Sequence, residues 1–128
     1  MNMRIAIAYN RPSRKLAQSL INHLSLLDHE VIDLGTEAND DEMDCTDGVY
    51  QAGTAMLNRG YDRLILMYGA GLASSMAANK IKGLYAAPAH DVFEARLARS
   101  LYNTNVLCLA HRWLDAENAN SIVDEWLK

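Results

Sequence analysis

Short apolar runs alternate with segments of helical periodicity along the whole chain, and this alternation constrains the fold more than any other feature of the sequence. A short apolar run, a helical segment and another short apolar run are typical of parallel strands joined by crossover helices. Strands buried on both faces are expected to be apolar throughout, and the third and fifth runs have this character. The runs predicted as strands are 4–8, 30–34, 63–67, 84–89 and 106–110.

The segments between these runs predict helices with one apolar face. Their expected apolar positions are Leu16, Leu20, Ile21, Leu24 and Leu27, then Val49, Ala52, Met56 and Leu57, then Phe93, Leu97 and Leu101, and finally Ala119, Ile122, Val123 and Trp126. A helix of small residues is expected after the third run. Five such units in 128 residues predict a single α/β domain, 1–128, of three α/β/α layers, Rossmann-like, around a five-stranded parallel sheet.

Charge and composition exclude several classes of function. The chain has 12 Lys and Arg against 16 Asp and Glu, which argues against non-specific binding of nucleic acid. No apolar run approaches the length of a membrane span. Cys108 lies in an apolar run and Cys45 in an acidic segment, so we expect two free thiols, no disulfide and a cytoplasmic protein.

An acidic segment precedes the second helix. Residues 37–47 include six acidic side chains and no basic one. The simplest interpretation is a solvated loop that leads to a helix N-terminus, where Asp47 would favour the helix dipole. A metal site is the alternative, but the spacing does not fit a calcium-binding loop, and we expect no metal.

The fold restricts where a ligand can bind. In open parallel sheets the binding site lies beyond the carboxyl ends of the strands. This rule selects residues 9–11, 68–75, 90–91 and 111–112. His90 and His111 are candidates for proton transfer within this set, because a neutral imidazole is suited to it near pH 7.

A glycine turn after the third strand is the most informative local feature. Gly69 and Gly71 stand where strand becomes helix, and exposed backbone N–H groups there suit a phosphate or an oxyanion. Ser74 and Ser75 would add hydroxyl donors, although a merely tight turn fits the spacing equally well. The spacing also approaches a dinucleotide-binding motif, with Asp91 twenty residues after Gly71. The third glycine of that motif is missing.

Many segments in the same order resemble one family. The sequence is similar to type B ribose-5-phosphate isomerases and galactose-6-phosphate isomerase subunits over nearly its whole length. The resemblance implies conversion of aldose phosphates to ketose phosphates without a cofactor, at a site shared by two subunits. The similar segments are 3–7, 29–36, 69–71, 77–83, 86–87, 90–91, 95–99 and 105–109.

The chemistry that the resemblance implies requires particular groups. Aldose–ketose isomerisation moves a proton between C1 and C2 through an enediolate. It needs a base, an acid near the two oxygens, donors for the developing charge and a cationic clamp for the phosphate.

The chain departs from the family at these positions. Tyr68 stands where the ribose-type enzymes carry a cysteine base, and a phenol with an ordinary pKa near 10 is a poor base at neutral pH. Asn10 and Arg11 replace an Asp-His pair. Leu101 replaces a ring-opening histidine that is contributed across the interface. Ala70 replaces a threonine of the glycine turn and Cys45 a tyrosine, and phosphate-binding arginines of a C-terminal extension are not expected in this chain.

These considerations define the candidate site. We predict Tyr68 and His90 as catalytic residues, and a homodimer, a higher oligomer, or a hetero-oligomer with a cysteine-bearing family member. The alternatives are a non-catalytic sugar-phosphate-binding or regulatory homologue, and an enzyme of different chemistry built on His90 or His111. The residues predicted to bind the sugar phosphate are Asn10, Arg11, Gly69, Ala70, Gly71, Ser74, Ser75, Tyr102 and Asn103.

Overall fold

The computed structural model of the chain describes residues 2–35 and 45–128. Strands and helices alternate along these residues, as the sequence predicts. The elements are β1 (Arg4–Tyr9), the 3-10 helix η1 (Arg11–Ser13), α1 (Arg14–Leu26), β2 (Glu30–Gly35), α2 (Thr46–Arg59), β3 (Arg63–Met67), α3 (Leu72–Ala78), β4 (Ala86–Pro88), α4 (Val92–Ser100), β5 (Val106–Leu109) and α5 (Ala116–Leu127).

The strands form one sheet of order β2-β1-β3-β5-β4, in which every pair is parallel. β1 and β3 pair from Ile5 opposite Arg63 to Tyr9 opposite Met67. The chain leaves β1 toward β2 and then returns to the other side of β1 as β3. The order of the strands therefore reverses between β1 and β3, and the predicted five-stranded parallel sheet is confirmed.

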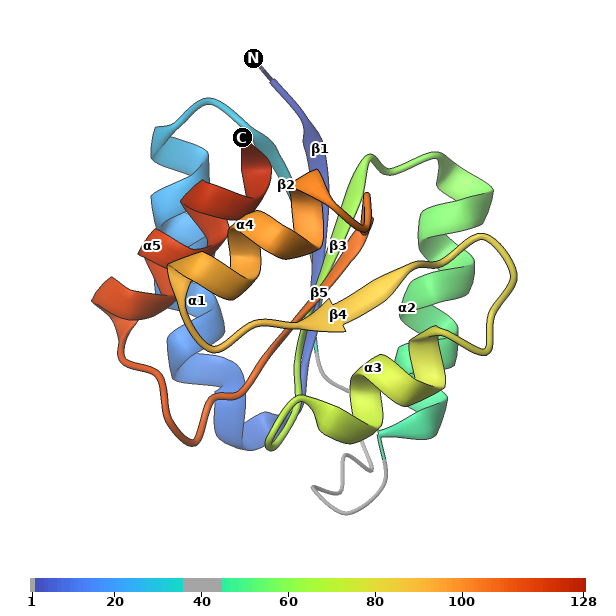
Figure 1. The fold of residues 1–128 in the computed structure, drawn as a ribbon. Helices are drawn as coiled ribbons and strands as arrows, with labels where there is room; N and C mark the ends of the chain where they lie inside the picture. Colours follow the sequence, from blue (N-terminus) through green and yellow to red (C-terminus); the bar gives the residue numbers. More distant parts are fainter. Residues whose placement is uncertain (1, 36–44) are drawn as a thin grey trace.

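Helices cover both faces of the sheet (Figure 1). On one face, α1, α4 and α5 bury a core that includes Ile7, Leu20 and Trp126. On the other face, α2 and α3 bury a second core that includes Val49, Leu66 and Tyr68. The central strand β3 separates the two cores, so its alternate side chains enter different environments. This arrangement confirms the predicted three layers.

Short polar side chains set the starts of α4 and α5. Asp91 accepts a 2.8 Å hydrogen bond from the backbone N–H of Glu94, and Asp115 accepts one of the same length from the N–H of Asn118. Each carboxylate satisfies a backbone donor that the helix itself leaves unpaired. The capping role of Asp91 accounts for this residue without a bound dinucleotide.

The edge strand β4 is shorter than the sequence predicts, so the expected strand over 84–89 is wrong at both ends. The amide side chain of Asn79 takes the place of a neighbouring strand here. Its Nδ2 donates to the carbonyl of Ala86 at 2.8 Å, and its Oδ1 accepts from the N–H of Ala86 at 2.7 Å. Pro88 ends the strand and offers no N–H at the sheet edge, which limits further pairing.

Several predicted core positions prove to be exposed. Leu27 lies just beyond α1, and Leu57, Phe93 and Leu101 are between 45% and 66% exposed. In α4 the buried residues are Ala95 and Ala98. The helix packs against its neighbours through these small side chains, so its larger apolar residues remain outside the core.

In the part of the chain that the structure describes, no helix combines the length and the apolar character needed to cross a bilayer.

Candidate functional site

The candidate site lies where the strand order reverses, at the carboxyl ends of β1 and β3. The backbone N–H of Asn10 donates to the carbonyl of Met67 at 3.1 Å. This bond joins the first residue after β1 to the last residue of β3. The structure thus brings the segment containing Asn10 and Arg11 next to the segment that begins at Tyr68.

Asn10 is fully buried, and its side chain has a fixed orientation. Its Oδ1 accepts hydrogen bonds from the backbone N–H of Ser13 at 3.2 Å and from the Ser13 hydroxyl at 2.6 Å. The Nδ2 group is also buried and finds no acceptor among the described residues. A buried donor of this kind is costly unless an acceptor reaches it. Arg11, the next residue, is exposed in η1.

The glycine turn has the geometry that its two glycines permit. Gly69 and Gly71 adopt φ values of 49° and 84°, which side chains with a Cβ rarely adopt. Ser74 Oγ donates to the carbonyl of Gly71 at 3.3 Å, and Ser75 Oγ donates to that of Leu72 at 2.9 Å. Both hydroxyls are therefore occupied within the first turn of α3. The partly exposed backbone of Gly69 and Ala70 is the part of this segment best placed to meet a ligand.

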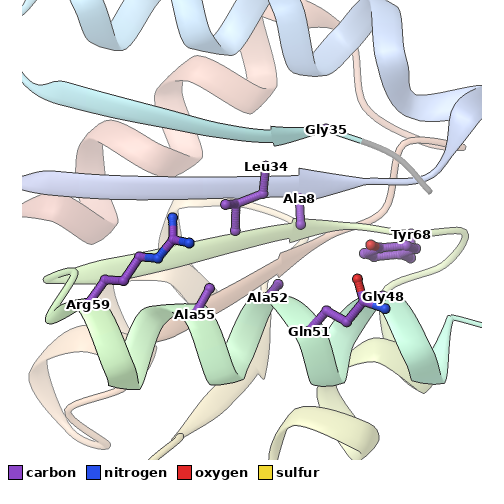
Figure 2. Close-up of a pocket in the computed structure, with 9 residues that line it drawn as sticks. All are labelled: Ala8, Leu34, Gly35, Gly48, Gln51, Ala52, Ala55, Arg59 and Tyr68. Atoms are coloured by element: carbon purple, nitrogen blue, oxygen red, sulfur yellow. The ribbon is translucent and has the colours of Figure 1, made fainter.

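Tyr68 immediately precedes the glycine turn. Its side chain lines a cleft between α2 and the sheet (Figure 2). The cleft has a volume of about 200 Å³. Tyr68 stands at one end and Arg59 at the other, and small side chains lie between them. The lining residues are Ala8, Leu34, Gly35, Gly48, Gln51, Ala52, Ala55, Arg59 and Tyr68.

His90 occupies a different environment from Tyr68. It follows β4, which is separated from β3 by β5. Its Nδ1 lies 3.0 Å from Glu94 Oε1, and its ring lies edge-on to Trp113 with centroids 6.3 Å apart. These partners belong to the side of α4 and α5, whereas Tyr68 packs on the side of α2. The structure does not bring the two predicted catalytic residues together.

His111 lies on the same side of the sheet as α1 and α5. It lines a separate cavity of about 430 Å³. The side chains of Lys15 and Ser19 from α1 line this cavity as well. His111 therefore lies near the start of α1, away from the cleft that contains Tyr68.

Tyr102 and Asn103 lie at the amino-terminal ends of the strands, whereas the glycine turn lies at the carboxyl ends. They precede β5, whereas Tyr68 follows β3, and the two strands are parallel. Four strand residues span roughly 13 Å, so one chain cannot place both groups on one small sugar phosphate. Asn103 accepts a hydrogen bond from Arg99, and Tyr102 is 69% exposed.

Cys108 lies beneath the glycine turn, where the backbone of Gly71 approaches its carbonyl. Burial raises the pKa of the Cys108 thiol to about 12, although a hydrogen bond with Ser74 lowers it in part and the nearby Cys45 raises it. This thiol is therefore protonated at neutral pH and is not suited to replace a missing base. Both cysteines are free, as predicted.

The predicted acidic loop over 36–44 lies outside the described residues, and Asp47 stands in the first turn of α2 as expected. Residues 2–35 and 45–128 contain no group of three His, Cys, Asp or Glu side chains placed to hold a metal ion.

Sequence reasoning missed the wall of the cleft that α2 provides. Gly48 and Gln51 line the cleft, and Cys45, which precedes α2, belongs to the same core cluster as Tyr68. One signal was available, because an isolated glycine inside a helical pattern often has a packing reason. The residue that packs against Gly48 is Tyr68, however, which is twenty residues away in the sequence.

Comparisons with known proteins find relatives over nearly the whole chain. The profile of the Ribose/Galactose Isomerase family matches residues 5–128. The chain is 38% identical to a probable ribose-5-phosphate isomerase B of Mycoplasma pneumoniae, over the whole chain and 84% of that protein. It is 35% identical to ribose-5-phosphate isomerase B of Escherichia coli, over 88% of this chain and 74% of that protein. The structure resembles ribose-5-phosphate isomerase B from Mycoplasma genitalium with bound ribulose-5-phosphate. That comparison has a TM-score of 0.85 and 36% identity, over 98% of this chain and 83% of the other.

Proposed function

Because the chain belongs to the ribose/galactose isomerase family, we propose that it interconverts the aldose and ketose forms of a pentose or hexose phosphate. The observation that carries this proposal is the meeting of Asn10, Tyr68 and the glycine turn at the point where the strand order reverses. Two relatives, of which the chain covers 84% and 74%, are named for an isomerase of this class. The reaction needs no resident cofactor for its proton transfer.

Each step of the reaction requires a group at this edge of the sheet. A base removes the proton from C2 of the aldose and returns it to C1, while a proton moves from the C2 hydroxyl to the C1 oxygen. The enediolate between these steps carries negative charge on oxygen, which hydrogen-bond donors stabilise. The Nδ2 group of Asn10 and the backbone at Gly69 and Ala70 are the donors that we assign to this charge.

Tyr68 is the group that we assign to carry the proton. It stands immediately before the glycine turn, and its phenol oxygen lies in the cleft beside α2 (Figure 2). His90 is the alternative proton carrier. It is more exposed than Tyr68 and is paired with Glu94 on the other side of the sheet. A variant of each residue distinguishes them.

Arg11 is the side chain that we assign to the phosphate. It follows Asn10 directly and is exposed at the same edge of the sheet. A guanidinium group binds phosphate through charge-assisted hydrogen bonds and can do so bidentately.

We further propose that two copies of the chain form the complete site. Six apolar or aromatic side chains on α3, on and just after α4, and just before the edge strand β4 are each at least 58% exposed. They are Leu72, Met76, Tyr85, Phe93, Leu101 and Tyr102. Figure 1 shows α3 and α4 on either side of the edge strand β4. A second copy seated on this apolar surface would bury it and bring Tyr102 and Asn103 toward the glycine turn of the first copy. We place the protein in the cytoplasm, where its two free thiols stay reduced.

Proton NMR in D₂O tests the proposed function directly. The purified protein is incubated with tetrose, pentose and hexose phosphates, and deuterium entering C1 or C2 is measured. We expect exchange with at least one sugar phosphate, and its loss in Tyr68→Phe but not in the control Tyr61→Phe, which alters a tyrosine before β3 at the other edge of the sheet.

Three other outcomes lead elsewhere. If His90→Ala loses exchange while Tyr68→Phe stays active, His90 and not Tyr68 is the residue that carries the proton. Exchange only after a cysteine-bearing family member is added would show a hetero-oligomer. In the third outcome, a sugar phosphate stabilises the protein without any exchange, either alone or with such a partner. That result would overturn the proposed isomerase activity and indicate a sugar-phosphate-binding protein.

A further inference from the structure

The phenol of Tyr68 occupies space that exists only because residue 48 is glycine. A Cβ added at Gly48 would lie 2.7 Å from the phenol oxygen of Tyr68. The next nearest atoms are Tyr68 Cζ at 3.5 Å and Cε1 at 3.7 Å, both at ordinary contact distance. The conflict therefore concerns the hydroxyl oxygen alone and not the ring.

The ring of Tyr68 is covered on every side except the cleft. Tyr68 is only 7% exposed and belongs to the core cluster formed with α2 and α3. Its backbone follows directly on Met67, the last paired residue of β3, and the N–H of Gly71 donates to its carbonyl at 2.9 Å. The hydroxyl can avoid an added Cβ at Gly48 only if the ring turns further into the cleft or α2 shifts, and either change moves the phenol oxygen.

Gly48 does not stabilise α2, the helix to which it belongs. It is the third residue of α2, and glycine is a poorer helix former than alanine. No positive φ requires a glycine at this position. The three nearest atoms that a Cβ at this position would meet all belong to Tyr68.

We propose that Gly48 is a positioning residue for Tyr68, which holds the phenol oxygen in the cleft between α2 and the sheet by leaving room for it. In this arrangement the helix α2 determines where the proton-carrying group stands. The kinetic consequence rests on the proposed function, whereas the packing consequence does not.

A double-mutant cycle tests the proposal. Gly48→Ala is made in the unaltered chain and again in the Tyr68→Phe variant, which lacks only the phenol oxygen. We expect Gly48→Ala to lower the Tm by about 3 °C or more in the unaltered chain, and to leave it unchanged or raise it in the Tyr68→Phe variant. Failure of Gly48→Ala to fold in the unaltered chain, with folding restored by Tyr68→Phe, would be the same result in a stronger form.

Gly53→Ala is the matched control in the same helix. Its added Cβ would meet Leu84 at 2.6 Å and Ile81 at 3.1 Å, and none of the close atoms belongs to Tyr68. The change in Tm from Gly53→Ala should therefore be the same in the unaltered chain and in the Tyr68→Phe variant. An equal change from Gly48→Ala in the two backgrounds would overturn the proposal.

Kinetics separate positioning from simple loss of stability. In Gly48→Ala with Tyr68 retained, kcat should fall roughly tenfold, about 1.4 kcal/mol in the barrier, while KM changes little. Any residual rate of Tyr68→Phe should not fall further when Gly48→Ala is added. Unchanged kcat in folded Gly48→Ala would also overturn the proposal. If no sugar phosphate is converted by the unaltered protein, the proposed function fails, and the Tm cycle alone decides on Gly48.

Discussion

The hydroxyl of Tyr9 donates a 2.9 Å hydrogen bond to Asp33 Oδ1 and so joins the end of β1 to the end of β2. The same phenol oxygen lies 3.2 Å from Gln18 Nε2, which donates to it from α1. Asp33 Oδ1 also accepts the N–H of Gly35 at 2.8 Å. These bonds fix the strand that leads into Asn10, so the position of the candidate site depends on them.

Tyr9→Phe tests the contribution of this bond to stability. We expect a loss of about 1 kcal/mol in the free energy of unfolding at neutral pH, because Asp33 then loses one of its donors. Chemical denaturation measures the change. Gln18→Ala, which leaves the bond from Tyr9 to Asp33 in place, should cost less.

The same variant has a predictable effect at high pH. Burial, and after it the bond to Asp33, raises the pKa of Tyr9 above its ordinary value near 10. Above pH 10 the unfolded chain releases this proton before the folded chain does, so stability falls as pH rises. The unaltered protein should lose stability more steeply above pH 10 than Tyr9→Phe, and parallel curves would contradict this assignment.

Asn10 offers a way to separate a structural bond from a ligand-binding donor. In Asn10→Asp the carboxylate can still accept from Ser13, but the Nδ2 donor is lost. We expect a loss of stability, because the carboxylate would place a charge at a fully buried position, and a KM raised about tenfold in the folded protein. Asn10→Ala should lose the cap as well, with a cost of about 1 kcal/mol in stability and a similar rise in KM. A KM unchanged in Asn10→Asp would remove Asn10 from the substrate site.

Cys108 should contribute a separate pH dependence. Its pKa is raised by burial from 9.0 to about 12, so the unfolded chain loses the thiol proton first as pH rises above 9. Stability should then fall by up to about 1.4 kcal/mol per pH unit between pH 9 and 12. Cys108→Ala should show a shallower decline in this range, as measured by urea denaturation at several pH values. Equal slopes in the two proteins would contradict the raised pKa.

Leu101 tests the proposed dimer. Its side chain is 66% exposed at the end of α4, so Leu101→Asp should leave the fold of one chain intact while placing a charge in the interface. We expect a larger dissociation constant of the dimer by analytical ultracentrifugation. Leu26→Asp is the control, because Leu26 is 83% exposed on α1. An equal effect of both variants would place the interface elsewhere.

Most of the architecture could be predicted because it depends on local patterns. The apolar run of β3 and the helical spacing of Leu20 and Leu24 specify elements whose buried faces need no knowledge of distant residues. The glycine turn was also predictable, since the positive φ values of Gly69 and Gly71 reflect a property of glycine itself. β4 is shorter than predicted, and its first residue, Ala86, pairs on its outer side with the amide of Asn79, a partner that no local pattern reveals.

The partner that each candidate-site side chain contacts depended instead on the packing of elements distant in sequence. The sequence by itself determined that Tyr68, Asn10 and His90 follow strands of a parallel sheet, because strand and helix periods are local. Only the tertiary structure decided that Tyr68 lies against Gly48 and that His90 lies beside Trp113. The physical reason is that side chains on opposite faces of a sheet meet different partners. Those partners depend on the spatial order of the strands and on which helices cover each face.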